Sequence, residues 1–197
     1  PLELKRRKIE IVDYRSESAS KLAKLQEQAP ALQIWAEGAD KTKGKSRFEL
    51  HPADEFAIYT APPSPTELRS ALEIVRPKKV YLFGVSPAPE KPDAFLTRLT
   101  GFAKYVINQK GGKVTVGELA VATGQREGAI RLGLEWLAAG GHVSMQREDD
   151  TILLSPGNGE LNQYLQRELY LAVKGILEET AAYRAHFQRA EAERLLE

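Results

Sequence analysis

The chain has 197 residues and no cysteine, and its 28 Lys and Arg residues nearly balance its 27 Asp and Glu residues, which leaves a formal net charge of +1. The missing cysteines exclude disulfides, Cys-ligated zinc and a thiolate nucleophile, and they favour a reducing, cytoplasmic setting. The balanced charge excludes the strongly basic composition of many nucleic-acid binders, although it allows a local basic patch. No apolar run approaches the ~18 residues that a membrane span needs, so we expect no membrane association. Because the first residue is not Met, we expect the chain to be a piece of a longer protein.

The positive charge is concentrated in the first part of the chain. Residues 1–91 carry a net charge of +3, residues 92–157 are neutral, and residues 158–197 carry −2. Lysine and arginine side chains can contact the phosphates of a nucleic acid, but short basic runs are often only solvated surface. The candidate nucleic-acid contacts are the residues of two basic runs: Lys5, Arg6, Arg7, Lys8, Lys41, Lys43, Lys45 and Arg47.

Residues 1–91 alternate short β-rich runs with helical patterns, which predicts a small three-layer α/β domain with a mainly parallel sheet. The clearest local signal is a helix start: Ser64 suits the N-cap, Pro65 suits the first helical position, and Glu67 completes a capping box. We expect strands over residues 9–14, 32–36, 55–59 and 80–83, and helices over residues 18–28 and 65–75.

Three prolines between residues 85 and 92 indicate a linker or a domain boundary, and a different pattern follows. Helical patterns are succeeded by two β-rich runs that a polar turn joins. Three helices followed by a two-stranded hairpin match a winged helix, so we expect residues 92–157 to form a winged-helix-like domain. The expected helices cover residues 93–109, 116–122 and 125–139, and the expected strands cover residues 142–146 and 151–154.

The last segment, residues 158–197, has the pattern of a long helix with an apolar stripe that includes Leu161, Leu165, Leu169 and Phe187. Such a stripe needs a covering surface. We therefore expect this segment to pack on both preceding domains or to meet a partner.

No arrangement of residues in the sequence points to catalysis. Gly44-Lys45-Ser46 invites comparison with a phosphate-binding loop, but the Walker pattern needs a glycine where this chain has Ala39. The three histidines are scattered, and none has a carboxylate at metal-ligand spacing. We expect the fragment itself not to be an enzyme and to hold no metal or cofactor, with an NTPase or a nuclease as the competing interpretation.

The expected third helix of residues 92–157 is poorly suited to reading duplex DNA. Arg126 and Arg131 are offset by Glu127 and Glu135, so its formal charge is zero, and the two arginines are only weaker candidates for nucleic-acid contact. Trp35 and Trp136 are interpreted as core residues. Tyr14, Tyr59 and Phe83 lie near the carboxyl ends of expected strands, where open α/β sheets place ligands.

Several blocks of the sequence resemble one family. They are the Ala-Pro-Pro-Ser-Pro-Thr-Glu run that starts at Ala61, the segment from Arg76 to Gly84, the helix from Phe95 to Gly112, and the run from Arg131 to Leu137. Together they look like the C-terminal region of the bacterial single-stranded-DNA-specific exonuclease RecJ. The resemblance extends from about residue 9 to the C-terminus and is clearest over residues 56–140. In that family, hydrolysis belongs to an N-terminal DHH phosphoesterase core with manganese, whose motifs are absent here.

The resemblance implies a non-catalytic accessory domain of a 5′-3′ single-stranded-DNA exonuclease that acts in DNA recombination and repair. Such a region would dock single-stranded-DNA-binding protein or a helicase. The alternative is a module that binds single-stranded DNA weakly and guides the strand. A winged-helix transcription regulator is a further interpretation.

Overall fold

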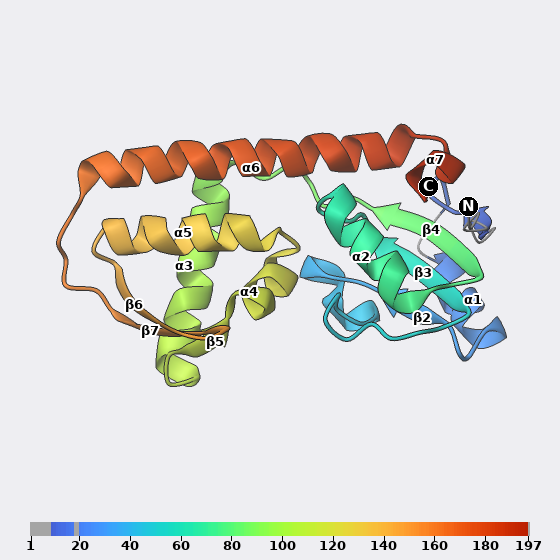
Figure 1. Cartoon of the computed structure of the whole chain (residues 1–197), viewed down its shortest axis with the longest axis horizontal. Helices are drawn as coiled ribbons and strands as arrows, with labels where there is room; N and C mark the ends of the chain where they lie inside the picture. Colours follow the sequence, from blue (N-terminus) through green and yellow to red (C-terminus); the bar gives the residue numbers. More distant parts are fainter. Residues whose placement is uncertain (1–8, 18–19, 197) are drawn as a thin grey trace, which may run out of the picture. The chain divides into compact units, whose positions relative to one another are not determined.

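The structure is a computed structural model that describes residues 9–17 and 20–196. The chain divides into two compact units (Figure 1). Unit 1 combines the described residues up to 87 with those from residue 183 onward, and unit 2 comprises residues 88–182. Unit 1 is therefore built from two separate stretches of the sequence.

Unit 1 contains a four-stranded sheet in which every neighbouring pair is parallel, in the order β1-β4-β3-β2. The prediction of a mainly parallel α/β sheet is confirmed, and all four strands lie where the β-rich runs predicted them. The strands are β1 (Glu10–Asp13), β2 (Gln33–Trp35), β3 (Glu55–Thr60) and β4 (Lys79–Val85).

Alternate residues of the central strands β3 and β4 point to opposite faces of this sheet, so each face has its own apolar core. On one face, Tyr59 and Phe83 pack with Leu22 and Leu25 of helix α1 (Ser20–Gln28). On the other, apolar residues of both strands pack with helix α2 (Pro65–Val75) and with Phe187. The crossovers β1-α1-β2 and β3-α2-β4 run in opposite directions along the sheet and use opposite faces, as two crossovers of the same hand require.

Helix α2 begins at the residue that the sequence predicted, and its cap differs from the expected one in detail. Ser64 is the N-cap, and its hydroxyl oxygen accepts a hydrogen bond from the Thr66 backbone N–H at 3.1 Å. Glu67 accepts a hydrogen bond from the Ser64 hydroxyl, so the reciprocal capping box is replaced by a contact between the two side chains. A complete capping box does form at Thr115 and Glu118, where the sequence analysis did not predict one.

Unit 2 contains helices, a short strand and a hairpin, in an order close to the predicted one. Residues 113–115, predicted only to lead into a helix, pair with the hairpin as a third antiparallel strand, in the order β5-β7-β6. Gly112 makes this turn with a φ of +84°, and a Cβ there would lie 2.2 Å from the Leu154 carbonyl oxygen. The elements are α3 (Pro92–Gln109), β5 (Lys113–Thr115), α4 (Val116–Thr123), α5 (Glu127–Ala139), β6 (Val143–Glu148) and β7 (Thr151–Pro156).

The C-terminal helical segment is shorter than expected and consists of two helices, α6 (Gln163–Arg189) and α7 (Ala192–Leu195). Helix α6 serves two cores. Val173 and Leu177 are buried in the core of unit 2, whereas Phe187 is buried in that of unit 1. Although α6 is 27 residues long, none of the helices in the described part of the chain combines the length and apolar character needed to cross a bilayer.

Candidate functional site

The second basic run lies in the connection between β2 and β3. No helix or strand was expected between residues 36 and 55, but residues Gly38–Lys43 form a 3-10 helix, here η1. The backbone then rejoins the sheet, because the Lys45 N–H donates to the Ile34 carbonyl at 2.7 Å and the Ala36 N–H donates to the Lys45 carbonyl. The residues that flank η1, Ala36 and Lys45, are therefore hydrogen-bonded to each other beside strand β2.

A buried carboxylate anchors this connection. Glu37 is only 3% exposed, and its Oε1 accepts hydrogen bonds of 2.9 Å from Trp35 Nε1, from the Arg47 backbone N–H and from Arg47 Nε. Arg47 also pairs with the second Glu37 oxygen and lies 3.8 Å from Glu67. Since its guanidinium is largely occupied by carboxylates, Arg47 is the least available of the candidate nucleic-acid contacts in this run.

The three lysines of the run have different surroundings. Lys43 Nζ contacts Asp40 at 2.6 Å and the Tyr59 hydroxyl at 2.8 Å, and it lies over the Tyr59 ring. The hydrogen bond with Asp40, followed by the one with Tyr59, raises the pKa of Lys43. Lys45 Nζ lies 2.6 Å from His51 Nε2, and Lys41 is exposed. Lys41 and Lys45 are thus better placed than Lys43 to meet an external phosphate.

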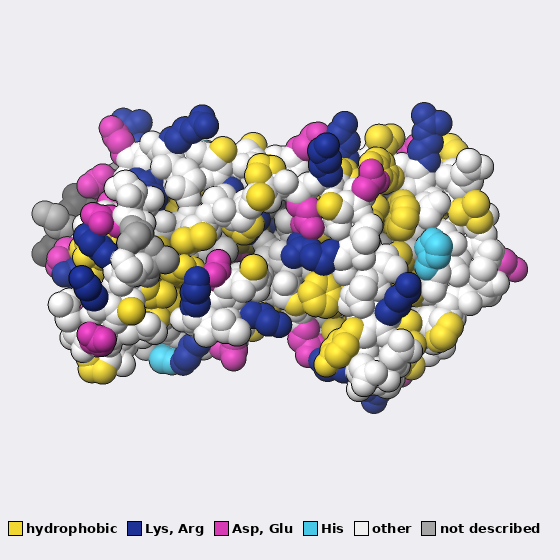
Figure 2. All heavy atoms as spheres, turned by 180° about the vertical axis from the view of Figure 1, so that it is seen from behind, with side chains coloured by type: hydrophobic (Ala, Val, Ile, Leu, Met, Phe, Trp, Pro, Cys, Tyr) yellow, Lys and Arg dark blue, Asp and Glu magenta, His cyan; other side chains and the backbone are white. Residues whose placement is uncertain are grey.

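The remaining candidate cations are those of the first basic run and the two arginines of unit 2. Lys5, Arg6, Arg7 and Lys8 lie outside the described residues. In unit 2, Arg126 is paired with Glu179 at 2.9 Å and Arg131 with Glu127 at 3.0 Å. Figure 2 shows Lys and Arg side chains interspersed with Asp and Glu on the face that it presents.

The aromatic residues at the carboxyl ends of the strands form a packed cluster. The ring of Phe83 lies 5.4 Å from that of Tyr14 and 5.7 Å from that of Tyr59. Tyr59 and Phe83 are buried, and Tyr14 is half-buried. These rings belong to the core beneath α1. Trp35 is likewise buried and stacks on Phe56, while Trp136 packs partly buried against the core of unit 2.

Gly44-Lys45-Ser46 lacks the local geometry of a phosphate-binding loop. Such a loop presents backbone N–H groups at the start of a helix. Here the Lys45 N–H is used by Ile34, and the next helix after Ser46 in the described chain is α2, which begins at Pro65. No group of three His, Cys, Asp or Glu side chains among the described residues is arranged to hold a metal ion.

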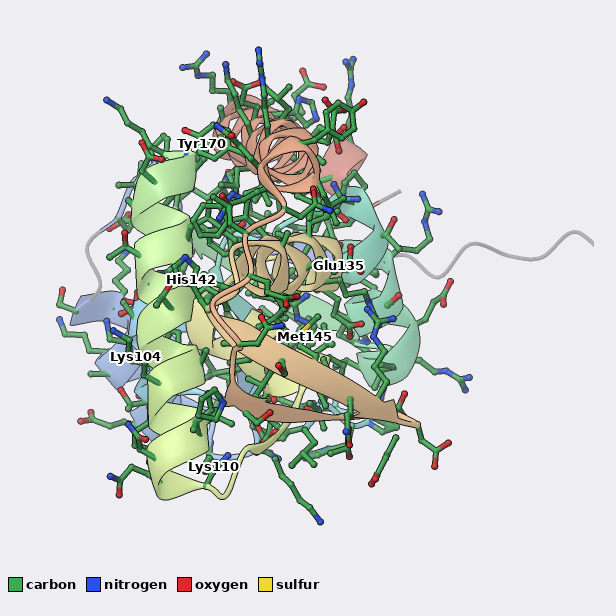
Figure 3. All side chains as sticks on the ribbon, turned by 90° about the vertical axis from the view of Figure 1, so that its left-hand side faces the viewer. Lys104, Lys110, Glu135, His142, Met145 and Tyr170 are labelled. Atoms are coloured by element: carbon green, nitrogen blue, oxygen red, sulfur yellow. The ribbon has the colours of Figure 1, made fainter. Side chains whose placement is uncertain are left out.

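Unit 2 has a surface groove that sequence reasoning missed. It has a volume of about 550 Å³ and lies between the end of α5, strand β6 and the segment that begins α6; we call it the α5–α6 groove. Figure 3 labels two of its residues, Glu135 on α5 and Met145 on β6. The lining residues that matter most below are Glu135, Ala139, Met145, Glu160, Leu161 and Leu165.

Apolar side chains at the rim of this groove are unusually exposed. Leu161 is 61% exposed, Leu165 44%, and the neighbouring Tyr164 79%. The signal was present in the sequence, because Leu161 and Leu165 belong to the predicted apolar stripe of the last segment. The stripe alone does not tell which of its residues the rest of the chain covers.

Comparisons of the chain with protein-family models, with curated proteins and with solved structures gave no match.

Proposed function

We propose that the chain is a non-catalytic accessory region of a RecJ-like 5′-3′ single-stranded-DNA exonuclease that acts in DNA recombination and repair. It docks a partner protein, such as single-stranded-DNA-binding protein or a helicase. Hydrolysis with manganese belongs to a DHH core outside this chain. The resemblance of residues 56–140 to the family supports this assignment.

The observation that carries the docking function is the cluster of exposed apolar side chains at Leu161, Tyr164 and Leu165. Contiguous exposed apolar surface beside a groove is typical of protein interaction sites. The charges of the chain favour the same function, since Arg126 and Arg131 are both paired with glutamates. Tight DNA binding through these residues would need unopposed cations.

We also propose that unit 2 is a winged helix. The order of its elements supports this assignment, because α3, α4 and α5 precede a β6-β7 hairpin and β5 pairs with that hairpin. In this fold the third helix commonly reads DNA. Arg131 of α5 and Arg126, the residue before α5, are both paired with glutamates. These ion pairs favour a protein-docking use of the fold in this chain.

A titration tests the docking function. The fluorescently labelled 197-residue chain is mixed with purified single-stranded-DNA-binding protein and, separately, with candidate repair helicases, and binding is followed by anisotropy. We expect at least one partner to bind with a Kd of about 10 μM or tighter. Absence of binding to every partner at concentrations of about 100 μM would contradict the function.

A second candidate function, weak guidance of single-stranded DNA, is favoured by one observation. Phe48 is 57% exposed and follows the basic run closely, in a connection that also carries Lys41 and Lys45. Single-strand binding commonly combines cations on the phosphates with an aromatic ring on which a base stacks. The test is the salt-dependent affinity for an oligonucleotide, which should fall when Lys41 and Lys45 become Ala and again when Phe48 becomes Ala. Absence of binding at low salt would rule this function out.

A further inference from the structure

The walls of the α5–α6 groove suit a helical occupant. Leu165 and the buried Leu169 lie one turn apart on α6 and line the groove, and Leu161, two residues before the helix begins, lines it as well. Ala138 and Ala139 of α5 also line the groove, and such small side chains permit close approach of a second helix. An amphipathic helix laid into a groove of this kind inserts apolar residues at helical spacing.

One adaptable side chain completes the lining. Met145 is the only methionine of the chain, and it faces the groove from strand β6. An unbranched thioether side chain can change rotamer at little cost and adjust to the shape of a partner. The groove therefore offers a lining that can mould itself around inserted leucine or phenylalanine side chains.

The charged residues that line the groove are acidic. Its two charged lining residues are Glu135 and Glu160. Glu135 is paired with Arg147 at 3.2 Å, an exposed contact that a competing cation can replace, whereas Glu160 makes no ion pair within the described part of the chain. The end of α5 and the start of α6 border the groove with dipoles of opposite sign, so the carboxylates determine the sign of the local potential.

We propose, on the basis of the docking function above, that the α5–α6 groove binds a basic amphipathic helix of the partner protein. The apolar face of that helix contacts Leu161, Leu165 and Met145, and its Lys or Arg residues lie near Glu160 and Glu135. The groove thus selects a cationic helical segment and rejects an acidic one, because the same carboxylates repel a negatively charged peptide.

Synthetic peptides provide a direct probe. The first is an 18-residue peptide with Leu at helical spacing on one face and Lys on the other; the second has Glu at every Lys position; the third has the composition of the first in an order without helical periodicity. Anisotropy with the full 197-residue chain at about 150 mM salt should give a micromolar Kd for the first peptide only. Its helical circular dichroism should increase on binding. Equal binding of the acidic or the non-periodic peptide would overturn the inference.

Variants of the chain locate the binding. Leu161→Ser combined with Leu165→Ser should raise the Kd at least tenfold, and Glu160→Lys should raise it several-fold. The matched control is Leu171→Ser, which alters a 54% exposed leucine of the same helix outside the groove and should change the Kd less than twofold. All four substituted residues are exposed, so the fold should persist, which circular dichroism verifies. An unchanged Kd in both groove variants would refute the site, as would a self-association of the chain that the double variant abolishes.

The results separate this inference from the docking function. If a repair protein binds the chain and the groove variants do not weaken that binding, the docking function is supported and the α5–α6 groove is not the binding site. If the basic peptide binds at the groove and no repair protein binds the chain, the groove is a binding site for a basic helix and the assigned partners are wrong.

Discussion

Replacing Phe187 by Ala should destabilise unit 1 and leave unit 2 nearly unchanged. Phe187 lies near the end of α6, and its side chain is completely buried in the core that α2 covers. It packs closely on Gly84: a Cβ at that glycine would lie 2.9 Å from Phe187 Cε1. The substitution therefore leaves a cavity where the Phe187 ring packs against the sheet of unit 1.

The magnitude follows from the burial. A buried phenylalanine removes roughly 150–200 Å² from water, which at about 25 cal/mol per Å² amounts to about 4 kcal/mol. Measured Phe→Ala substitutions in cores cost about 3–5 kcal/mol. Four kcal/mol corresponds to a roughly thousand-fold larger fraction of opened molecules. Phe187→Leu, which keeps most of the volume, should cost less than about 1.5 kcal/mol.

Hydrogen exchange resolved by peptide measures where the destabilisation occurs. Protection should fall by about three orders of magnitude in peptides from β3 and β4 of unit 1, and by less than about threefold in peptides from α3 and α5 of unit 2. Leu171→Ala, an exposed change on the same helix, is the control and should leave both units within about 0.5 kcal/mol of the parent chain. Equal loss of protection in both units would refute the division of the chain, and no loss in unit 1 would refute the burial of Phe187.

Three further predictions concern unit 1. Burial, and then the charge of Glu67, raises the pKa of Tyr183 to about 12; the unfolded chain releases that proton near pH 10, so stability present below pH 10 should fall by up to about 2–3 kcal/mol as the pH approaches 12. Tyr183→Phe should remove this part of the alkaline loss in denaturant titrations, and an identical loss in the variant would contradict the assignment. Glu37→Gln should cost about 3 kcal/mol in urea unfolding because it removes the buried carboxylate charge that pairs with the Arg47 guanidinium, and a cost below about 1 kcal/mol would show that the pair is dispensable. Ser64→Ala should lower the free energy of unfolding by about 1 kcal/mol because the N-cap hydrogen bond is lost. Ser64→Asp should retain most of the stabilisation that the cap contributes, and equal losses in the two variants would argue against capping.

The elements that the sequence predicted well are those that local interactions determine. Helix α2 starts at Pro65 as expected, because a cap, a proline and an acidic residue within four positions all act on the same turn. The strands of unit 1 were found because they are short apolar runs bounded by breakers. The 3-10 helix of residues 38–43 was missed, because it depends on the burial of Glu37 against Arg47, ten residues away. Polar letters in a loop do not show which of them will be buried as a pair.

The candidate site divides in the same way. The sequence identified Lys41, Lys43 and Lys45 as cations, but only the fold shows Lys43 engaged by Asp40 and Tyr59. The α5–α6 groove was not predicted at all. Its rim belongs to a stripe that continues into the buried Val173 and Leu177, and long-range packing decides where the covered part of such a stripe ends.

The division of unit 1 between two stretches of sequence has a consequence for the order of folding during synthesis. Unit 2 is continuous, so it can form as soon as residues 88–182 have left the ribosome. The parallel sheet of unit 1 emerges earlier but lacks Phe187 and Ala192 until those two residues have been made. Domains that emerge first commonly fold first. In this chain, part of one apolar face of the unit 1 sheet stays uncovered until Phe187 and Ala192 have been made. During that interval the nascent chain is most exposed to aggregation and to chaperone binding.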